Sequence, residues 1–300
     1  MDSNLVIQRE KEFVDKLCRD NGYDSNICHL LYVIVPAFVI KYGVNKEKTV
    51  LNAFRDTKIV TSDEKDKYIK AYYTSKLRQV SGEYKTSKYL VLQNYSNTRM
   101  VDLIDNIVHE FNHAVNSYIN EIKVTNKYIY LRTGLTYRAY KKEDFSFIKK
   151  TKSYMLEEII NTKQTEEIIN IMKGFSTSNK LVSDTVYAIN SETNHKYNSN
   201  SYYLESYICK QILNNRTFIN TLASLRFNGD VYNITKWFDD ITGIDGSYKE
   251  LTKLLNDIYD LEIEYSNRKI FKNIILNKIK SLSDRVMEIV KTFDKNVNVR

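Results

Sequence analysis

The sequence predicts an α+β fold that is mostly helical, with a small antiparallel sheet before a central helix and a β-hairpin after it. Its 300 residues include only eight glycines and one proline, Pro36, and this scarcity favours long helices over tight turns. Between residues 57 and 96, short β-branched and aromatic runs alternate with polar turns, which is typical of strands. Elsewhere apolar residues recur every three or four positions, as on the packed face of a helix.

These patterns assign the elements in chain order. The helical pattern covers residues 3–19, 26–42, 46–54, 97–122 and the chain from 154 onward, apart from a polar loop at 191–201. The strand pattern covers residues 58–60, 68–73, 88–92, 128–132 and 135–140. Gly22 and Gly43 are expected to end the first two helices, and Thr98 or Asp102 to cap the central one. Thr133-Gly134 is expected to be the turn of the hairpin.

The most informative stretch of the chain is His109-Glu110-Phe111-Asn112-His113, in the middle of the central helix. Residues four apart share one face of a helix, so both imidazoles can reach one metal ion. Glu110 is turned by about 100° from His109, beside the metal position, where a general base would take a proton from a metal-bound water. The alternative is an exposed helix that carries two incidental histidines.

Catalytic zinc normally has three protein ligands and one open position, so the two histidines need a third ligand. The remaining histidines, His29 and His195, do not continue the motif. An acidic pair, Glu157-Glu158, begins a predicted helix 44 residues after His113, and Glu166 is a more remote candidate. The acidic pair could instead be an ordinary first helical turn whose charges favour the helix dipole.

Across residues 88–172, the sequence resembles the gluzincin metallopeptidases, the thermolysin-like clan that adds a glutamate from a later helix to H-E-x-x-H. The motif helix is similar to that of the lethal-factor type. This resemblance implies a zinc-dependent endopeptidase with one zinc ion held by His109, His113 and Glu158. The family usually carries an acid four residues after its ligand glutamate, whereas this chain has Thr162 there. Taking Glu157 as the ligand would put Asn161 at that position.

The resemblance also implies roles around the metal. Glu110 would be the general base for hydrolysis of a peptide or protein substrate. Tyr154, one turn before Glu158, or His195, in the polar loop, would stabilise the oxyanion. By analogy with the clan, an extended substrate would pair with the strand at 89–93.

The competing function is a catalytically weak or inactive H-E-x-x-H scaffold that acts as a regulatory binding protein. Nucleic acid is an unlikely partner because the chain has no helix-turn-helix or aromatic-interleaved basic motif. In the absence of repeats and linkers, we expect one peptidase-like domain, 1–300. Its parts would be N-terminal helices (1–55), a zinc core (56–175) and a C-terminal helical part (176–300).

Charge and cysteine content set further bounds. The net charge is +8, and residues 265–300 hold nine Lys or Arg against three Asp or Glu, above an apolar stripe that predicts a packed amphipathic helix. Cys18, Cys28 and Cys209 are odd in number and lack C-x-x-C spacing, which argues against a disulfide framework and a thiolate zinc site.

The longest apolar run, 30–40, is too short to span a bilayer and predicts a buried helix. Without a visible secretory signal, a cytoplasmic protein is expected, or a secreted one if the chain is a processed form.

Overall fold

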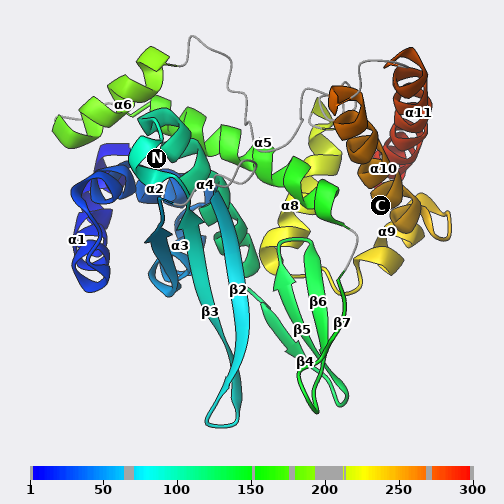
Figure 1. The fold of residues 1–300 in the computed structure, drawn as a ribbon, viewed down its shortest axis with the longest axis horizontal. Coiled ribbons are helices and arrows are strands. Elements are labelled where there is room, and N and C mark those ends of the chain that lie inside the picture. The colour runs from blue at the N-terminus through cyan, green and yellow to red at the C-terminus, as the bar shows by residue number, and fades with distance from the viewer. Residues whose placement is uncertain are drawn as a thin grey trace. The chain divides into compact units, whose positions relative to one another are not determined.

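In a computed structural model, the chain is an α+β protein in which helices predominate, as the sequence predicts (Figure 1). The structure describes residues 3–63, 71–150, 153–175, 180–192, 212, 214–267 and 272–297. It divides into two compact units: Met1–Tyr118 with Asn161–Ser201, and Ile119–Ile160 with Tyr202–Arg300. The division falls within helix α5, after Ile160. The single peptidase-like domain with its three parts stays a prediction.

The described elements of the first unit are α1 (Ser3–Asn21), α2 (Ser25–Tyr42), η1 (Val44–Lys46), α3 (Glu47–Asp56), β1 (Thr57–Thr61), β2 (Ala71–Val80), β3 (Glu83–Leu92), η2 (Tyr95–Asn97), α4 (Met100–Ser117), the second half of α5 (Tyr154–Lys173) and α6 (Lys180–Glu192). The second unit has β4 (Ile122–Val124), β5 (Tyr128–Thr133), β6 (Thr136–Lys141), β7 (Phe147–Lys150), α8 (Arg216–Asn228), α9 (Ile234–Thr242), α10 (Ser247–Asn267) and α11 (Lys272–Val297). The five segments expected to be helical all contain helices, and α4 is shorter than the expected 97–122.

Helix α2 is the centre of the first unit. It begins where the Asp24 side chain accepts a hydrogen bond from the Ile27 N–H at 2.9 Å, an N-cap that satisfies a free amide of the first turn. It ends at Gly43, whose φ is +88°. By length and composition alone α2 could cross a membrane, but ten of its residues are buried in the first unit. The prediction of a buried helix around the apolar run is therefore confirmed.

The sheet that precedes α4 is mixed rather than antiparallel. Its strand order is β1-β3-β2, with β1 parallel and β2 antiparallel to β3. The expected antiparallel sheet is therefore correct for β2 and β3 and wrong for β1. Helix α3 leads directly into β1, so this strand enters the sheet without the hairpin turn that would make it antiparallel.

Helix α4, which carries the H-E-x-x-H motif, is held at its start without the expected cap. Arg99 is the N-cap residue, and none of the described side chains caps the first turn, so the prediction of Thr98 or Asp102 was wrong. Instead Asp102 accepts a hydrogen bond from the Arg99 guanidinium at 2.9 Å. From Ile107 to Ser117 every residue of α4 is buried. Because this part of the helix is buried, its polar side chains need hydrogen-bond partners within the protein.

The second unit pairs an antiparallel sheet with a helical core. The predicted hairpin of β5 and β6 is present and gains β4 and β7 at its edges, in the order β4-β5-β6-β7. An apolar cluster joins the start of α5 to α8, α9, α10 and α11, with Phe238 stacked on Phe293 at 4.8 Å. Helix α11 buries Val286, Ile289 and Val290 into this cluster, which confirms the amphipathic helix expected near the C-terminus.

Two of the cysteines are joined. Cys18 of α1 and Cys28 of α2 form a disulfide, with their Cα atoms 5.9 Å apart. The cysteine count argued against a disulfide framework, and this bond corrects that expectation for one pair. The tight connection between α1 and α2 brings residues ten apart in sequence into contact, which spacing motifs do not capture.

Candidate metal centre

Phe111, one of the two residues between Glu110 and His113, fixes the orientation of α4. Phe111 stacks on Phe54 of α3 with ring centroids 4.1 Å apart, and Phe54 meets Phe38 of α2 edge to face at 5.1 Å. All three rings are buried. Because Phe111 is locked into this aromatic stack, His109, Glu110 and His113 must point to other sides of the helix.

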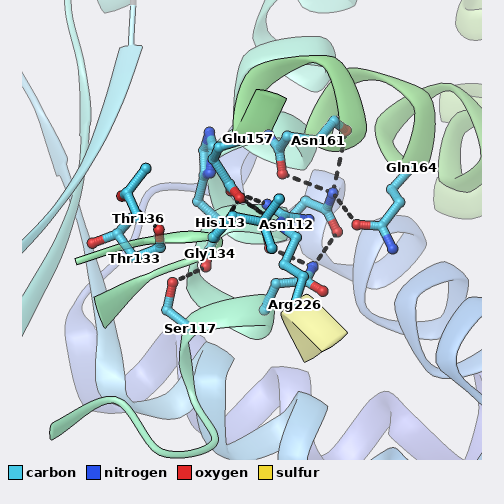
Figure 2. Close-up of polar contacts among 12 residues, drawn as sticks. Asn112, His113, Ser117, Thr133, Gly134, Thr136, Glu157, Asn161, Gln164 and Arg226 are labelled. Atoms are coloured by element: carbon cyan, nitrogen blue, oxygen red, sulfur yellow. Dashed lines mark hydrogen bonds and ion pairs between the residues drawn. The ribbon is translucent and has the colours of Figure 1, made fainter. Parts of the chain in front are cut away.

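Asn112 anchors α4 to α5 through buried amides. Its Nδ2 donates to Asn161 Oδ1 at 2.8 Å and approaches Gln164 Oε1 at 3.4 Å, as Figure 2 shows. Asn161 in turn donates from Nδ2 to the backbone oxygen of His109 at 2.9 Å. Asn112 and Asn161 have no exposed surface. Leaving either amide unpaired would cost about 1–3 kcal/mol, so this network holds α5 in a fixed register on α4.

The same network extends to α2. The Tyr42 hydroxyl donates to Asn112 Oδ1 at 2.6 Å and accepts from Asn116 Nδ2 at 2.6 Å. Asn116 also donates to the backbone oxygen of Asn112 at 2.8 Å. Three helices of the first unit therefore share one buried polar cluster behind the motif.

Glu158 lies on α5, three residues before Asn161 on the same continuous helix. His109, His113 and Glu158 form a buried group whose ligand atoms all lie within 4.8 Å of one another. The two imidazole rings are 5.0 Å apart and nearly perpendicular, at 78°. Two imidazoles and one carboxylate are a donor set typical of a three-ligand metal centre. These residues could therefore hold one metal ion.

Glu110 is positioned by the sheet. One of its carboxylate oxygens, Oε2, accepts the backbone N–H of Tyr73 in β2 at 2.6 Å. The side chain is 9% exposed, so it is largely shielded from bulk water. A carboxylate that accepts one backbone hydrogen bond keeps a second oxygen with which to accept a proton. This geometry fits a general base that is held in place by the strand beside it.

Glu157 faces a different environment from Glu158, as the 100° step between adjacent helical residues requires. Within the second unit, Arg226 of α8 donates from Nε to both Glu157 oxygens at 2.9 Å (Figure 2). The Leu135 N–H also donates to Glu157, at 2.7 Å. Arg226 is fully buried and Glu157 is 2% exposed. Glu157 is thus committed to a buried ion pair, and the geometry favours Glu158 as the metal ligand.

A second buried arginine supports this region. Arg132 donates from Nη1 to the backbone oxygens of Gly134 at 2.8 Å and Arg226 at 2.9 Å. Burial lowers the pKa of Arg132 to about 10, against the opposing influence of nearby Tyr232 and Glu157. The side chain still carries its charge at neutral pH. It ties the β5–β6 turn to α8 around the Glu157 carboxylate.

Gly134 leaves room for that carboxylate, and we expect Gly134→Ala to destabilise the protein strongly. A Cβ there would lie 2.0 Å from Glu157 Oε1, and φ is +56°. Gly243, in the same unit, has φ +70° and nothing within 4 Å of its Cβ position. Both substitutions carry a left-handed backbone penalty of about 1–2 kcal/mol, and only Gly134→Ala adds a clash. In thermal unfolding, Gly134→Ala should therefore melt at a lower temperature than Gly243→Ala. Equal melting temperatures of the two variants would contradict the clash.

The structure also places the other predicted residues. Tyr154 is half-buried in the first turn of α5 and packs against the apolar cluster of the second unit. Its role as oxyanion donor stays a prediction. His195 lies outside the described residues. Glu166 pairs with Lys163 at 3.6 Å and is absent from the described metal-binding group, which instead contains Glu158.

The strand expected to receive substrate has no open edge. Residues 88–92 of β3 pair with β1 on one side and with β2 on the other. The prediction that an extended peptide pairs with 89–93 was therefore wrong. The prediction took this strand from the clan by analogy, and local sequence does not show which strands lie at the edges of a sheet. Strand β2 ends the described sheet order and donates the Tyr73 N–H to Glu110, so β2 is the strand beside the base.

Sequence reasoning missed the residues that support the site. Asn112 occupies a position that the H-E-x-x-H pattern leaves open, and Arg226 lies 69 residues after its partner Glu157. A signal was present for Asn112, because a polar residue on a helix face that is otherwise apolar requires a partner. No local signal connects Arg226 to Glu157.

No family model, curated protein or solved structure matches this chain.

Proposed function

We propose that this protein is a zinc-dependent endopeptidase that hydrolyses peptide bonds. The observation that carries the proposal is the buried group of His109, His113 and Glu158, with Glu110 one residue from His109 on the same helix. Two histidines and one glutamate fit zinc as a catalytic ligand set, because they leave a position open. A structural zinc site would close that position with a fourth protein ligand.

In this proposal, different residues of the chain bind the metal, transfer the proton and bind the substrate. His109, His113 and Glu158 would hold the zinc ion, which when bound would lower the pKa of a water toward about 7 and would polarise the scissile carbonyl. Glu110 accepts the proton of the attacking water and returns it to the leaving amine, and its bond to the Tyr73 N–H keeps the carboxylate directed. An extended substrate would bind along β2, the strand beside the base, through backbone hydrogen bonds that do not depend on sequence.

The test combines metal content with activity. Elemental analysis of the purified full chain should find one zinc per chain, and a chelator should remove both the zinc and the cleavage of casein. Adding zinc back should restore both. A chain that takes up no zinc on reconstitution would contradict the site, whereas a chain that binds zinc but cleaves no protein substrate would contradict the peptidase proposal alone.

A further inference from the structure

One end of the four-stranded sheet in the second unit gathers two turns side by side. The turn between β4 and β5 and the turn between β6 and β7 lie at the same end because their strands are neighbours in the order β4-β5-β6-β7. The Lys142 N–H donates to the Lys127 backbone oxygen at 3.0 Å and joins the turns directly. We refer to residues 123–128 and 141–148 together as the sheet tip (Figure 1).

The sheet tip exposes apolar side chains. Its exposed residues are Val124 (44%), Tyr128 (39%), Phe145 (36%), Phe147 (59%) and Ile148 (40%). They are five of the fifteen large apolar residues that are exposed in the described part of the chain. Single exposed apolar residues are common, but a group gathered at one end of one sheet is typical of an interaction surface.

The backbone of the sheet tip adds an independent observation. Phe145 has φ +58°, a left-handed conformation that is rare for a bulky residue. Hydrogen bonds hold it there, from the Phe145 N–H to the Lys141 oxygen at 3.1 Å and from the Ser146 N–H to Asp144 Oδ1 at 2.9 Å. The strained conformation does not bury the ring. Strain that leaves an apolar ring exposed favours a functional role over packing within the chain.

The charge of the sheet tip indicates the partner. Lys123, Lys127, Lys141 and Lys142 outnumber Glu143 and Asp144, which leaves a net charge of +2. Three of these lysines line a surface hollow of about 580 Å³ together with Asn126, Tyr128 and Glu143. Lysines that flank exposed aromatic rings can extend their ammonium groups to phosphate while their stems cover apolar surface.

We propose that the sheet tip docks on an anionic lipid surface, with its apolar side chains at the interface and its lysines on the headgroups. Phe and Tyr rings suit the interfacial region of a bilayer, and lysines are attracted to the negative potential of anionic leaflets. Val124 and Ile148 favour lipid over nucleic acid, because aliphatic side chains have no ring face on which a base can stack. The inference is independent of the metal centre.

Vesicle sedimentation of the full chain tests the proposal. The protein should sediment with vesicles of phosphatidylcholine and phosphatidylserine (70:30) and far less with pure phosphatidylcholine. Phe145→Ser with Phe147→Ser should lower binding at least tenfold. Lys127→Gln with Lys142→Gln should also lower it at least tenfold, since each lysine near an anionic surface contributes about fivefold. Added salt should weaken binding further by screening.

The matched control is Ile274→Ser with Leu276→Ser on the basic helix α11, where both side chains are exposed (54% and 45%). This variant should bind the vesicles like the unmodified protein. All of the substituted side chains are exposed, so circular dichroism should show unchanged folding. The proposal is overturned if the unmodified protein ignores anionic vesicles, if only the α11 variant loses binding, or if a single-stranded oligonucleotide binds in place of the vesicles.

Discussion

Replacing Glu110 with glutamine is expected to lower the turnover of any peptide that the protein cleaves by a factor of about 10² to 10⁴. Glutamine keeps the shape of glutamate but cannot accept the proton of the attacking water. Its side-chain oxygen can still accept the Tyr73 N–H that holds Glu110 at 2.6 Å, so the fold and the site geometry should persist. Steady-state kinetics on a fluorogenic peptide library, with zinc content measured in parallel, would report both properties.

The control for this substitution is Glu12→Gln on the exposed surface of α1, which should leave turnover unchanged. Zinc occupancy of the Glu110→Gln protein should equal that of the unmodified protein, because Glu110 is not in the ligand group. Full activity of Glu110→Gln would remove this residue from the mechanism. Loss of zinc in this variant would instead make Glu110 a ligand.

Substituting the two adjacent glutamates of α5 should give opposite results. Glu158→Gln removes a ligand carboxylate and should weaken zinc binding at least tenfold, since changes to the partners of metal ligands alone cost about 10- to 100-fold. Glu157→Gln leaves Arg226 buried without its counter-charge, and breaking a buried pair costs up to about 3–5 kcal/mol of the free energy of unfolding. Zinc affinity of the folded Glu157→Gln protein should be unchanged.

Zinc competition with a chromogenic chelator and urea unfolding of the metal-free proteins would separate these effects. The pair also serves as its own control, because the two substitutions are chemically identical and one residue apart. If Glu157→Gln lost zinc while Glu158→Gln kept it, the ligand assignment would be wrong. The buried pair of Glu157 and Arg226 would then have to open on metal binding.

Much of the fold follows from local patterns. Helices α2 and α4 and the β5–β6 hairpin carry their signals within their own residues, as periodic apolar positions or as the Thr133-Gly134 turn. The parallel pairing of β1 and the edge strands β4 and β7 were missed, since strand partners are chosen by tertiary packing rather than by local sequence. The Cys18–Cys28 bond was missed because the tight connection between α1 and α2 creates this contact, and cysteine spacing motifs do not capture it.

The residues of the candidate site also divide into those with a local sequence signal and those whose partners are set by tertiary packing. His109, Glu110 and His113 were predicted from one helical turn, because their spacing alone determines that they can converge. The choice between Glu157 and Glu158 stayed open, because a one-residue difference in register turns a side chain by 100° and the partner that resolves it, Arg226, is far along the chain. The buried amides at Asn112 and Asn161 could not be connected without knowing that α4 and α5 cross there.

The network that joins α2, α4 and α5 is built from amides and one phenol, none of which carries a charge near neutral pH. The pH and the salt concentration act mainly on charged groups, so they should have little effect on the hydrogen bonds where these helices cross. The network therefore holds Asn161 of α5 on Asn112 and His109 of α4 without any ionised group. A change of pH or of salt concentration should therefore leave this helix crossing intact, whatever it does to the charged groups elsewhere in the chain.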